Sequence, residues 1–583
     1  MKNFFKNVAA NIVAFFIIAF VCVTSLIFFS IYSVISGSGE VKVKKNSVLV
    51  LDAKTILIDS PTEDNPSFFD MNNENSKVLT YDVVNAIRKA KTDDKIAGIS
   101  FENDNITAGL TQLDDVRAAL EDFKKSGKFV LAYGNTVSQG SYYVGSVADQ
   151  YFLHPAGGIE LKGMGAEIVF YKDFFDKYGI GVDVIRHGKY KAAVEPYLRN
   201  EISEENKEQM SVLLNDIWAG TAKKIATSRK LDSANFKTVV DSLYGIIPEL
   251  SLQNKLADKL IQKGEYDTIL KAKAKIKDSD KLNKISISKY VESLDEDEFG
   301  DQVAVLYASG AIYSGEGYSD IYSKNLITEI RNLKLNKKVK SVVLRINSPG
   351  GSANASDEIL YELLELKKEK PLVVSFGDYA ASGGYYIAMA GDKIYSEPNT
   401  LTGSIGVFGV LMNYKEIANK NGLRSDIVST NANARYYSGM NGLTPSAENM
   451  ITKSVEQTYK RFVDFVTKNR KKSFEQIDEL GGGRVWSGSR AKDNGLVDEL
   501  GTLEDAIKFA AQKSKLSSYN VSTYPKKMTQ IEQFFKKKGE DETISTQFLK
   551  SQLGKENFKT YQMLMDPKSK SGLFMEIPYK LSF

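Results

Sequence analysis

A serine and a group of backbone amides in the C-terminal half have the residue types that acyl-transfer chemistry needs. Ser382 lies in the run 380–384, Ala-Ala-Ser-Gly-Gly, at the start of an apolar helical pattern. A hydroxyl between small residues at a helix N-terminus can act as a nucleophile. Gly350 and Gly351 follow an apolar run, and glycines there allow backbone N–H groups to converge on an oxyanion. Each cluster taken alone is read more readily as a helix cap or a tight turn.

The serine would need a base, and the chain offers two kinds. Histidine is the commoner partner of a catalytic serine, and the sequence has two, His154 and His187. Lysine can serve when it is neutral, and burial against apolar surface disfavours its charged form. Lys191 lies in the run 190–196, Tyr-Lys-Ala-Ala-Val-Glu-Pro, and Lys189 is its nearest rival because the two would share one face of a strand. On the residues alone these candidates remain open.

The composition excludes several other kinds of site. With two histidines and a single cysteine, Cys22, the sequence lacks the H-E-x-x-H zinc motif and any C-x-x-C pair, and it has no phosphate-binding loop. We therefore expect no metal, no cofactor and no intramolecular disulfide. The net charge of +4 comes from 77 basic and 73 acidic residues interspersed along the chain. This balance gives no electrostatic reason to expect nucleic acid as a partner.

The sequence repeats itself weakly at a constant offset of 243 residues. The pair Ile87-Arg88 recurs as Ile330-Arg331, and Asp183 recurs as Asp426. A period this long indicates duplicated domains rather than a solenoid. Within the second copy, apolar runs of strand length alternate with helical patterns. Because the two copies are related by a constant offset, we expect the same alternation in the first copy. The alternation predicts an α/β fold with mostly parallel strands.

The two copies have lost opposite parts of the candidate site. At the same offset Ser382 corresponds to Gln139, so the first copy lacks the nucleophile. Lys191 corresponds to Ala434, so the second copy lacks the lysine. This reciprocal loss predicts a single site that is built between the two copies.

The clusters around Gly350 and Ser382, together with the run 401–407, Leu-Thr-Gly-Ser-Ile-Gly-Val, resemble in order and spacing the signal peptide peptidase A family in its long, two-domain form. Members of this family are membrane-bound serine peptidases with a Ser–Lys dyad and the fold of the Clp protease and crotonase superfamily. The resemblance implies that Ser382 is the nucleophile. It implies that Lys191, in its Tyr-Lys-x-Ala-x-Glu-Pro motif, is the general base and later the proton donor.

The same resemblance implies the remaining roles. The Ser404 hydroxyl would hold the lysine amine, and backbone N–H groups of Gly350, Gly351 and Gly383 would hold the oxyanion. The substrates would be cleaved signal peptides and other apolar peptides, and the chain would assemble as a homotetramer. It would be a single-pass protein of the inner (plasma) membrane, with its catalytic domains outside the cytoplasm on the periplasmic side.

The N-terminus predicts contact with a lipid bilayer. Residues 12–35 contain no charged side chain, and 24 helical residues rise about 36 Å, enough to cross a hydrocarbon core of about 30 Å. A cleaved signal peptide would have a shorter apolar region, of about 7–15 residues. We therefore expect an uncleaved transmembrane helix. Lysines flank the run on both sides, so the positive-inside rule leaves its orientation open.

Composition shifts divide the chain into five parts. These are a membrane anchor with its linker (1–47), an N-terminal α/β domain carrying the lysine (48–285), a charged connection (286–300), a C-terminal α/β domain carrying the serine (301–516) and a lysine-rich extension of helical pattern (517–583). We find no function for the extension in its sequence.

Two other functions fit parts of the pattern. One is a catalytically inactive membrane scaffold of the same fold, which the retention of both Ser382 and Lys191 argues against. The other is a crotonase-like acyl-CoA enzyme, which the anchor and the Ser–Lys pair argue against. The sequence does not fix the cleavage preference, the number of subunits, or whether the dyad forms within one protomer or between two.

Overall fold

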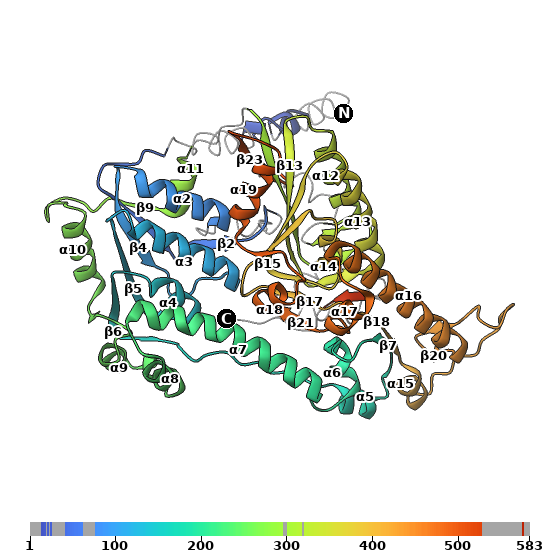
Figure 1. Ribbon diagram of the computed structural model, residues 1–583. Coiled ribbons are helices and arrows are strands. Elements are labelled where there is room, and N and C mark those ends of the chain that lie inside the picture. The colour runs from blue at the N-terminus through green and yellow to red at the C-terminus, as the bar shows by residue number, and fades with distance from the viewer. Residues whose placement is uncertain are drawn as a thin grey trace, which may run out of the picture.

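The computed structural model describes residues 13–18, 20–22, 24–25, 41–61, 76–294, 300–317 and 320–526, and the strand 574–576. Two α/β halves of similar construction lie side by side, the first in blue to green and the second in yellow to red (Figure 1). Each half has its own buried apolar core around a central sheet. The predicted α/β class is confirmed for both halves.

A parallel sheet forms the centre of the first half. Its central strands are buried along near-continuous apolar runs, as in Val48–Leu51, because helices cover both faces. In spatial order the strands are β8 (Lys259–Leu260), β6 (Gln150–Ile159), β5 (Phe129–Val137), β4 (Ile96–Glu102), β1 (Ser47–Asp52) and β9 (Lys284–Ser286). A separate pair is formed by β2 (Thr55–Ile58) and β3 (Ser76–Leu79).

The helices of the first half include one very long member, α7, which extends beneath the second half (Figure 1). Its N-terminus is capped by Ser203, whose hydroxyl accepts from the Asn206 N–H. The helices are α2 (Thr80–Thr92), α3 (Leu110–Lys124), α4 (Gln139–Gly145), α5 (Lys172–Tyr178), α6 (Glu195–Leu198), α7 (Glu204–Arg229), α8 (Ser233–Asp241), α9 (Pro248–Gln253), α10 (Lys263–Lys273) and α11 (Ile287–Glu292), with 3-10 turns η3 (Ala192–Val194) and η4 (Tyr244–Ile246).

The second half repeats this sheet and adds an antiparallel edge. In spatial order its strands are β21 (Val485–Ser487), β17 (Leu401–Gly403), β15 (Leu372–Ala381), β13 (Val339–Ser348), β10 (Gln302–Ser309) and β23 (Asn520–Tyr524), with β16 (Lys393–Ser396) between β15 and β22 (Glu499–Leu500). Its helices are α12 (Ser323–Leu335), α13 (Ala353–Lys367), α14 (Gly383–Ala388), α15 (Lys415–Lys420), α16 (Pro445–Arg470), α17 (Phe474–Leu480), α18 (Gly488–Asp493) and α19 (Leu503–Lys513). Only β21 runs antiparallel to its neighbour among these pairs.

The duplication is confirmed by the positions at which equivalent elements begin. Helices α2 and α12 begin at Thr80 and Ser323, and α3 and α13 begin at Leu110 and Ala353, so both pairs are 243 residues apart. Strands β5 and β15 begin with the same offset. The halves therefore share a fold as well as a faint sequence register.

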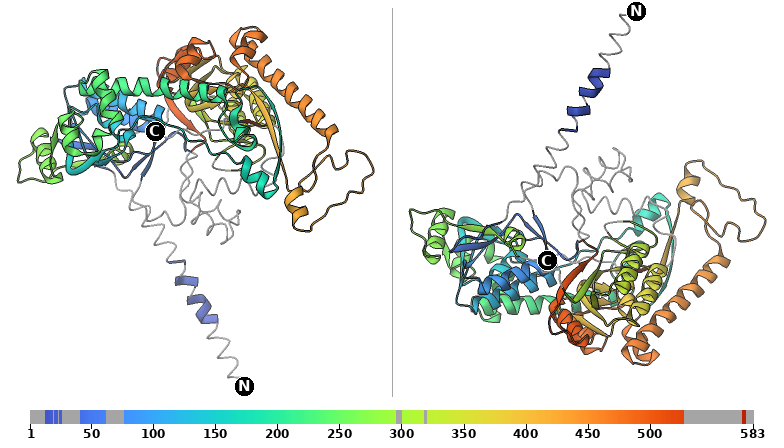
Figure 2. Two further views of the ribbon diagram at one scale, coloured as in Figure 1. Left: turned by 90° about the horizontal axis from the view of Figure 1, so that it is seen from below. Right: turned by 90° about the horizontal axis from the view of Figure 1, so that it is seen from above.

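A third sheet is assembled from distant parts of the chain and joins the halves. Its order is β12 (Ile321–Tyr322), β11 (Ile312–Tyr313), β14 (Gly350–Ser352), β24 (Phe574–Glu576), β18 (Val407–Asn413) and β7 (Gly181–His187). Strand β7 comes from the first half and pairs antiparallel with β18 of the second over seven residues. The segment that follows β7 is thereby brought onto the second half, as both views in Figure 2 show.

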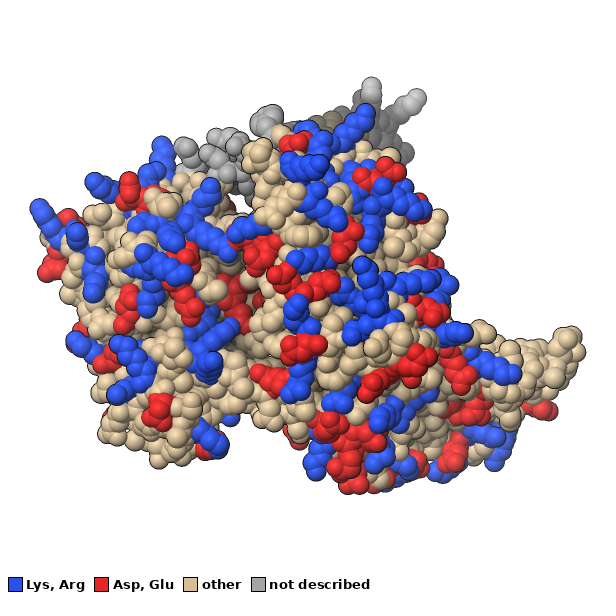
Figure 3. Space-filling view, in the orientation of Figure 1, with Lys and Arg blue, Asp and Glu red and all other residues tan. Residues whose placement is uncertain are grey.

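An arm of the second half projects away from the body of the protein. It consists of α15, the loop 421–436 and the small sheet β19 (Tyr437–Ser438) with β20 (Gly442–Leu443) (Figure 2). Charges of both signs are interspersed over the two halves, whereas the arm shows mostly uncharged atoms (Figure 3). Leu423 and Val428 in this loop are 61% and 98% exposed.

Two of the predicted domain boundaries are wrong. The connection 286–300 begins too early, because α11 within it buries Ile287 and Tyr290 in the core of the first half. The extension from 517 begins too early as well and starts as a strand, because β23 extends the second sheet by pairing with β10. All five residues of β23 are half-buried, so the strand has no distinct buried and exposed faces. Its sequence therefore lacks the alternation of apolar and polar residues that indicates a strand.

The predicted transmembrane helix falls mostly outside the described residues. Within the part of the chain that the structure does describe, no helix is both long and apolar enough to cross a bilayer.

Candidate active site

Ser382 lies at the sharp turn between strand β15 and helix α14. Its backbone has φ 55° and ψ −114°, a conformation that a residue with a Cβ rarely adopts and that the surrounding fold must hold in place. The Ser382 N–H donates to the Gly403 carbonyl at 2.8 Å, and its carbonyl accepts from the Tyr386 N–H at 2.8 Å. Position 384 requires a glycine, because a Cβ there would lie 2.7 Å from the Ser348 carbonyl oxygen. The turn presents a fully buried hydroxyl at the end of a central strand.

Lys191 from the first half meets this serine within one chain. Its Nζ lies 2.8 Å from Ser382 Oγ, 3.0 Å from Ser404 Oγ and 3.3 Å from the Ser404 carbonyl oxygen. The lysine is 1% exposed, and Ser382 and Ser404 are fully buried. The structure therefore brings together the predicted serine, lysine and orienting serine, and it places them in a single protomer.

Strand β7 and a glycine turn position the lysine. Lys191 follows β7 by four residues, and the Tyr190 N–H beside it donates to the Gly482 carbonyl at 3.0 Å. A Cβ at Gly483 would come within 2.6 Å of the Lys191 nitrogen, and Gly483 has φ +85°. Its N–H donates to Ile405 next to Ser404. The Gly482-Gly483 turn thus holds the lysine backbone against the segment that carries Ser404. The role of this turn was not predicted, although the triple glycine 481–483 is visible in the sequence.

The predicted oxyanion glycines converge near the serine, but they differ in availability. The position that a Cβ would take at Gly383 lies 3.2 Å from the Gly351 nitrogen and 3.3 Å from the Gly350 Cα. The Gly350 N–H already donates to Ser348 Oγ at 3.2 Å. Gly350, with φ +104°, therefore shapes the turn, whereas Gly351 and Gly383 are the better candidates for oxyanion donors.

The rival bases are engaged elsewhere. Lys189 is exposed, with Nζ 5.2 Å from the centre of the Tyr190 ring. The expectation that it would share a strand face with Lys191 is wrong, because β7 ends at His187. His187 stacks on Tyr459 with ring centroids 3.8 Å apart. The His154 ring bonds to the Gln262 side chain at 3.1 Å and accepts from the Ala156 N–H at 3.1 Å.

The equivalent of Ser382 in the first half has become structural. The Gln139 side-chain oxygen accepts from the N–H groups of Lys162 and Gly163 at 3.0 and 2.9 Å, and its amide donates to the Gly163 carbonyl at 3.0 Å. A side chain that satisfies three backbone groups fixes the loop after β6. Ala434, which stands where the second half would have its lysine, is an exposed residue of the projecting arm.

Another buried residue beside the lysine was missed. Glu195, 2% exposed, accepts hydrogen bonds from both the N–H and the hydroxyl of Ser203 and from the Asn206 side chain at 3.1 Å. It joins the turn after Lys191 to the start of α7. The Glu-Pro of the 190–196 run was the available signal, but sequence reasoning gave this glutamate no role.

Helix α7 of the first half packs against the second half beneath the site. The Gln209 side chain accepts from the Val485 N–H at 2.7 Å, and Asp216 accepts from the Ser487 hydroxyl at 2.9 Å. Leu213 and Ile217 of α7 pack in one apolar cluster with residues of β15, β17 and β21. This contact crosses from one half to the other and fixes the distance between the lysine and the serine.

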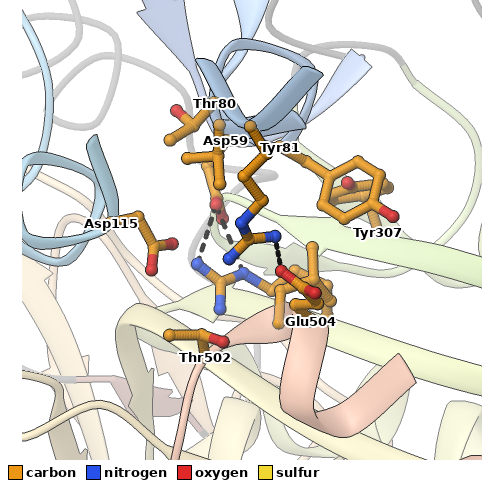
Figure 4. A pocket seen from close by; sticks show the side chains of 11 residues that line it. Asp59, Thr80, Tyr81, Asp115, Tyr307, Thr502 and Glu504 are labelled. Carbon is orange, nitrogen blue, oxygen red and sulfur yellow. Dashed lines mark hydrogen bonds and ion pairs between the residues drawn. The ribbon is translucent and has the colours of Figure 1, made fainter. Parts of the chain in front are cut away.

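A buried ionic cluster forms a second contact between the two halves. Arg345, 2% exposed, pairs with Asp59 of the first half at 3.0 Å and with Glu397 at 3.5 Å. Figure 4 shows Asp59 and Asp115 at the cavity beside it, whose volume of about 20 Å³ suffices for one water. Burial, opposed by Arg345 and reinforced by the nearby Asp114, raises the pKa of Asp115 to about 7. Burial also raises the pKa of Glu397 well above its usual range. The interface thus contains carboxyl groups that are hard to ionise.

The sequence is similar to those of known proteins. Residues 122–279 and 365–517 match the profile of peptidase family S49, and residues 295–402 match that of Clp protease. Protease 4 of Salmonella typhi is 34% identical over 551 residues, which cover 91% of this chain and 87% of that protein. Protease 4 of Haemophilus influenzae is 34% identical over 75% of this chain and 73% of its own length. The chloroplastic serine protease SPPA of Arabidopsis thaliana is 33% identical over 73% of this chain and 64% of its own length.

Proposed function

Because the chain belongs to peptidase family S49 and is a serine peptidase, we propose that it hydrolyses peptide bonds with a dyad of Ser382 and Lys191. The observation that carries the proposal is the 2.8 Å separation of Lys191 Nζ and Ser382 Oγ in a buried site. This distance lies within hydrogen-bond reach of a proton transfer. Only a neutral amine can accept a proton, and the desolvation of Lys191 disfavours its ammonium form.

The chemistry has two steps. Ser382 Oγ bonds to the scissile carbonyl carbon while its proton passes to Lys191 Nζ, and the amides of Gly351 and Gly383 stabilise the oxyanion. The C–N bond breaks as Lys191 returns the proton to the leaving amine, which leaves an ester on Ser382. A water then attacks the ester and gives a proton to Lys191, which passes it to Ser382 Oγ as the ester C–O bond breaks and the carboxylic acid is released. Ser404 keeps the amine directed at Ser382 in both steps.

We propose cleaved signal peptides and other apolar peptides as substrates, in a single-pass protein anchored to the inner membrane by residues 12–35. The apolar run supports the anchor, and the catalytic domains would lie on the periplasmic side. A relative in Enterococcus faecium, 34% identical over 40% of this chain and 70% of its own length, is named putative signal peptide peptidase SppA, and this name supports the substrate class.

We also propose a closed homo-oligomer, a homotetramer by family resemblance. Helix α7 of the first half packs against β21 of the second, whereas its repeat equivalent α16 borders the projecting arm. Exposed apolar residues on this arm and on α16, among them Val428 and Met450, would be covered if each second half received the first half of the next subunit.

Three incubations of the same protein test the activity and its substrate class. The full-length protein in detergent is incubated with a fluorophosphonate probe, with a synthetic signal peptide, and with a polar peptide of equal length. We expect the probe to label the natural protein but not its Ser382→Ala variant, and the signal peptide to be cleaved faster than the polar one. Absence of labelling would indicate an inactive scaffold. Labelling with faster cleavage of the polar peptide would refute the substrate class and leave the peptidase standing.

A further inference from the structure

Arg484 of the second half extends its side chain to the residue next to the lysine base. One guanidinium nitrogen donates to the Tyr190 hydroxyl at 3.2 Å, and another donates to the Glu208 carboxylate of α7 at 2.7 Å. The guanidinium also lies over the Tyr190 and Trp486 rings, 4.8 and 4.6 Å from their centres. The Arg484 side chain is 17% exposed. Its planar fork is thus held between the two halves by hydrogen bonds and by ring contacts.

The backbone of the same residue holds the serine that contacts the lysine amine. The Arg484 carbonyl accepts from the Ser404 N–H at 2.7 Å. Ser404 has φ 49°, a left-handed conformation that few residues with a Cβ adopt. The Ser404 hydroxyl lies 3.0 Å from Lys191 Nζ. A shift of the Arg484 backbone would therefore move the oxygen that the amine contacts.

Tyr190 transmits the position of the arginine to the lysine. The Tyr190 N–H donates to the Gly482 carbonyl at 3.0 Å, and its hydroxyl accepts from Arg484, so the tyrosine is held at both ends. Lys191 is the next residue in the chain and moves with the Tyr190 backbone. Proton transfer needs heavy atoms about 2.6–3.2 Å apart, so a displacement of about 1 Å would take Lys191 Nζ out of reach of Ser382 Oγ, now 2.8 Å away.

Resting on the proposed function, we infer that Arg484 is a positioning residue for the peptidase reaction. Its side chain fixes Lys191 through Tyr190, and its carbonyl fixes Ser404. Arg484 belongs to the second half, whereas Tyr190 and Glu208 belong to the first. The residue therefore couples the packing of the two halves to the alignment of the dyad. A lysine would replace it poorly, because a single ammonium lacks the fork that reaches two acceptors while it stacks on a ring.

Two arginine substitutions test the inference. Arg484→Met keeps the apolar stem but removes the hydrogen bonds to Tyr190 and Glu208. Arg490→Met is the matched control, because Arg490 lies six residues later and pairs with Asp216 of the same helix α7 at 2.9 Å. We expect Arg484→Met to lower kcat for a chromogenic peptide about tenfold and to leave KM within about twofold. Arg490→Met should leave both constants within about twofold.

A pH profile and milder variants exclude a merely structural effect. If the lysine is loosened, water reaches its amine and the ammonium form is disfavoured less, so the pH of half-maximal kcat should rise by about half a unit or more in Arg484→Met. Arg484→Lys can pair with Glu208 but lacks the second arm toward Tyr190, so it should recover only part of kcat. Tyr190→Phe should lower kcat about threefold in the natural protein and cause no further loss in Arg484→Met.

Thermal unfolding shows whether each variant is folded. A kcat of Arg484→Met within twofold of the natural protein, an equal loss in Arg490→Met, or an unchanged pH profile would overturn the inference while the peptidase stands. Should Arg484→Met not fold, Tyr190→Phe carries the test, and a kcat equal to that of the natural protein would overturn the inference. Absence of cleavage by the natural protein would refute the proposed function instead, and this inference with it.

Discussion

The dyad makes a quantitative prediction about paired substitutions. Lys191→Met keeps the length and apolar stem of the side chain but removes the amine that contacts Ser382 and Ser404 at 2.8 and 3.0 Å. Ser382→Ala removes the hydroxyl of the proposed nucleophile. If the two act as one unit, each change should lower kcat/KM by about 10⁴-fold, which is about 5.5 kcal/mol of transition-state stabilisation. The double variant should then be no worse than either single one.

Independent residues would behave differently. If the two losses were additive, the double variant would lose about 11 kcal/mol of transition-state stabilisation. If the two residues act as one unit, the interaction energy between the substitutions is about 5.5 kcal/mol. The assay is steady-state cleavage of a chromogenic peptide, with thermal unfolding to show that each variant is folded. Lys189→Met is the matched control, since this lysine is two residues away but exposed. Activity of Lys191→Met within tenfold of the natural protein, or a lysine-189 variant as inactive as the lysine-191 variant, would refute the reasoning.

Three further outcomes are expected. Ser404→Ala removes the 3.0 Å hydrogen bond to the lysine amine and should lower kcat about 10- to 100-fold with little change in KM, measured by peptide cleavage; an equal loss in KM would indicate a binding role instead. Asp115→Asn should stabilise the protein against urea at pH 8 but not near pH 4. The pKa of the Asp115 carboxyl is about 7 in the folded protein and 3.8 in the unfolded chain, so the natural protein loses stability as pH rises from 3.8 to 7, by at most about 4 kcal/mol. An equal effect of the substitution on stability at both pH values would contradict this reasoning. Protease added to spheroplasts should digest the protein beyond about Lys45, and protection until lysis would reverse the proposed topology.

The sequence allowed prediction of the duplication and of the dyad because both depend on local patterns. The 243-residue register was visible in recurring residues such as Ile87-Arg88 and Ile330-Arg331, which lie in the equivalent helices α2 and α12. Ser382 and Lys191 lie in short runs that are ambiguous alone but that, together with the Gly350 cluster and the run 401–407, resemble one family. The reciprocal replacement by Gln139 and Ala434 then indicated that the two runs belong to one site.

Pairings between distant segments could not be predicted in this way. Strand β23 is five half-buried residues, and β24 is three residues long, so neither shows a periodic pattern. Their place in a sheet is decided by the edges that the rest of the fold leaves open. The ion pairs of Arg345 are also tertiary, since Asp59 lies 286 residues away. A lone arginine in an apolar strand gives no sign of which carboxylate it will meet.

The division of the dyad between the halves has a consequence for synthesis. The ribosome makes Lys191 long before Ser382, and the Gly482-Gly483 turn that holds the lysine comes later still. A nascent chain that ends before that turn therefore lacks part of the site that Lys191 and Ser382 form. Proteolytic activity can begin only after the second half has folded against the first. The order of translation delays peptidase activity until most of the chain has been made.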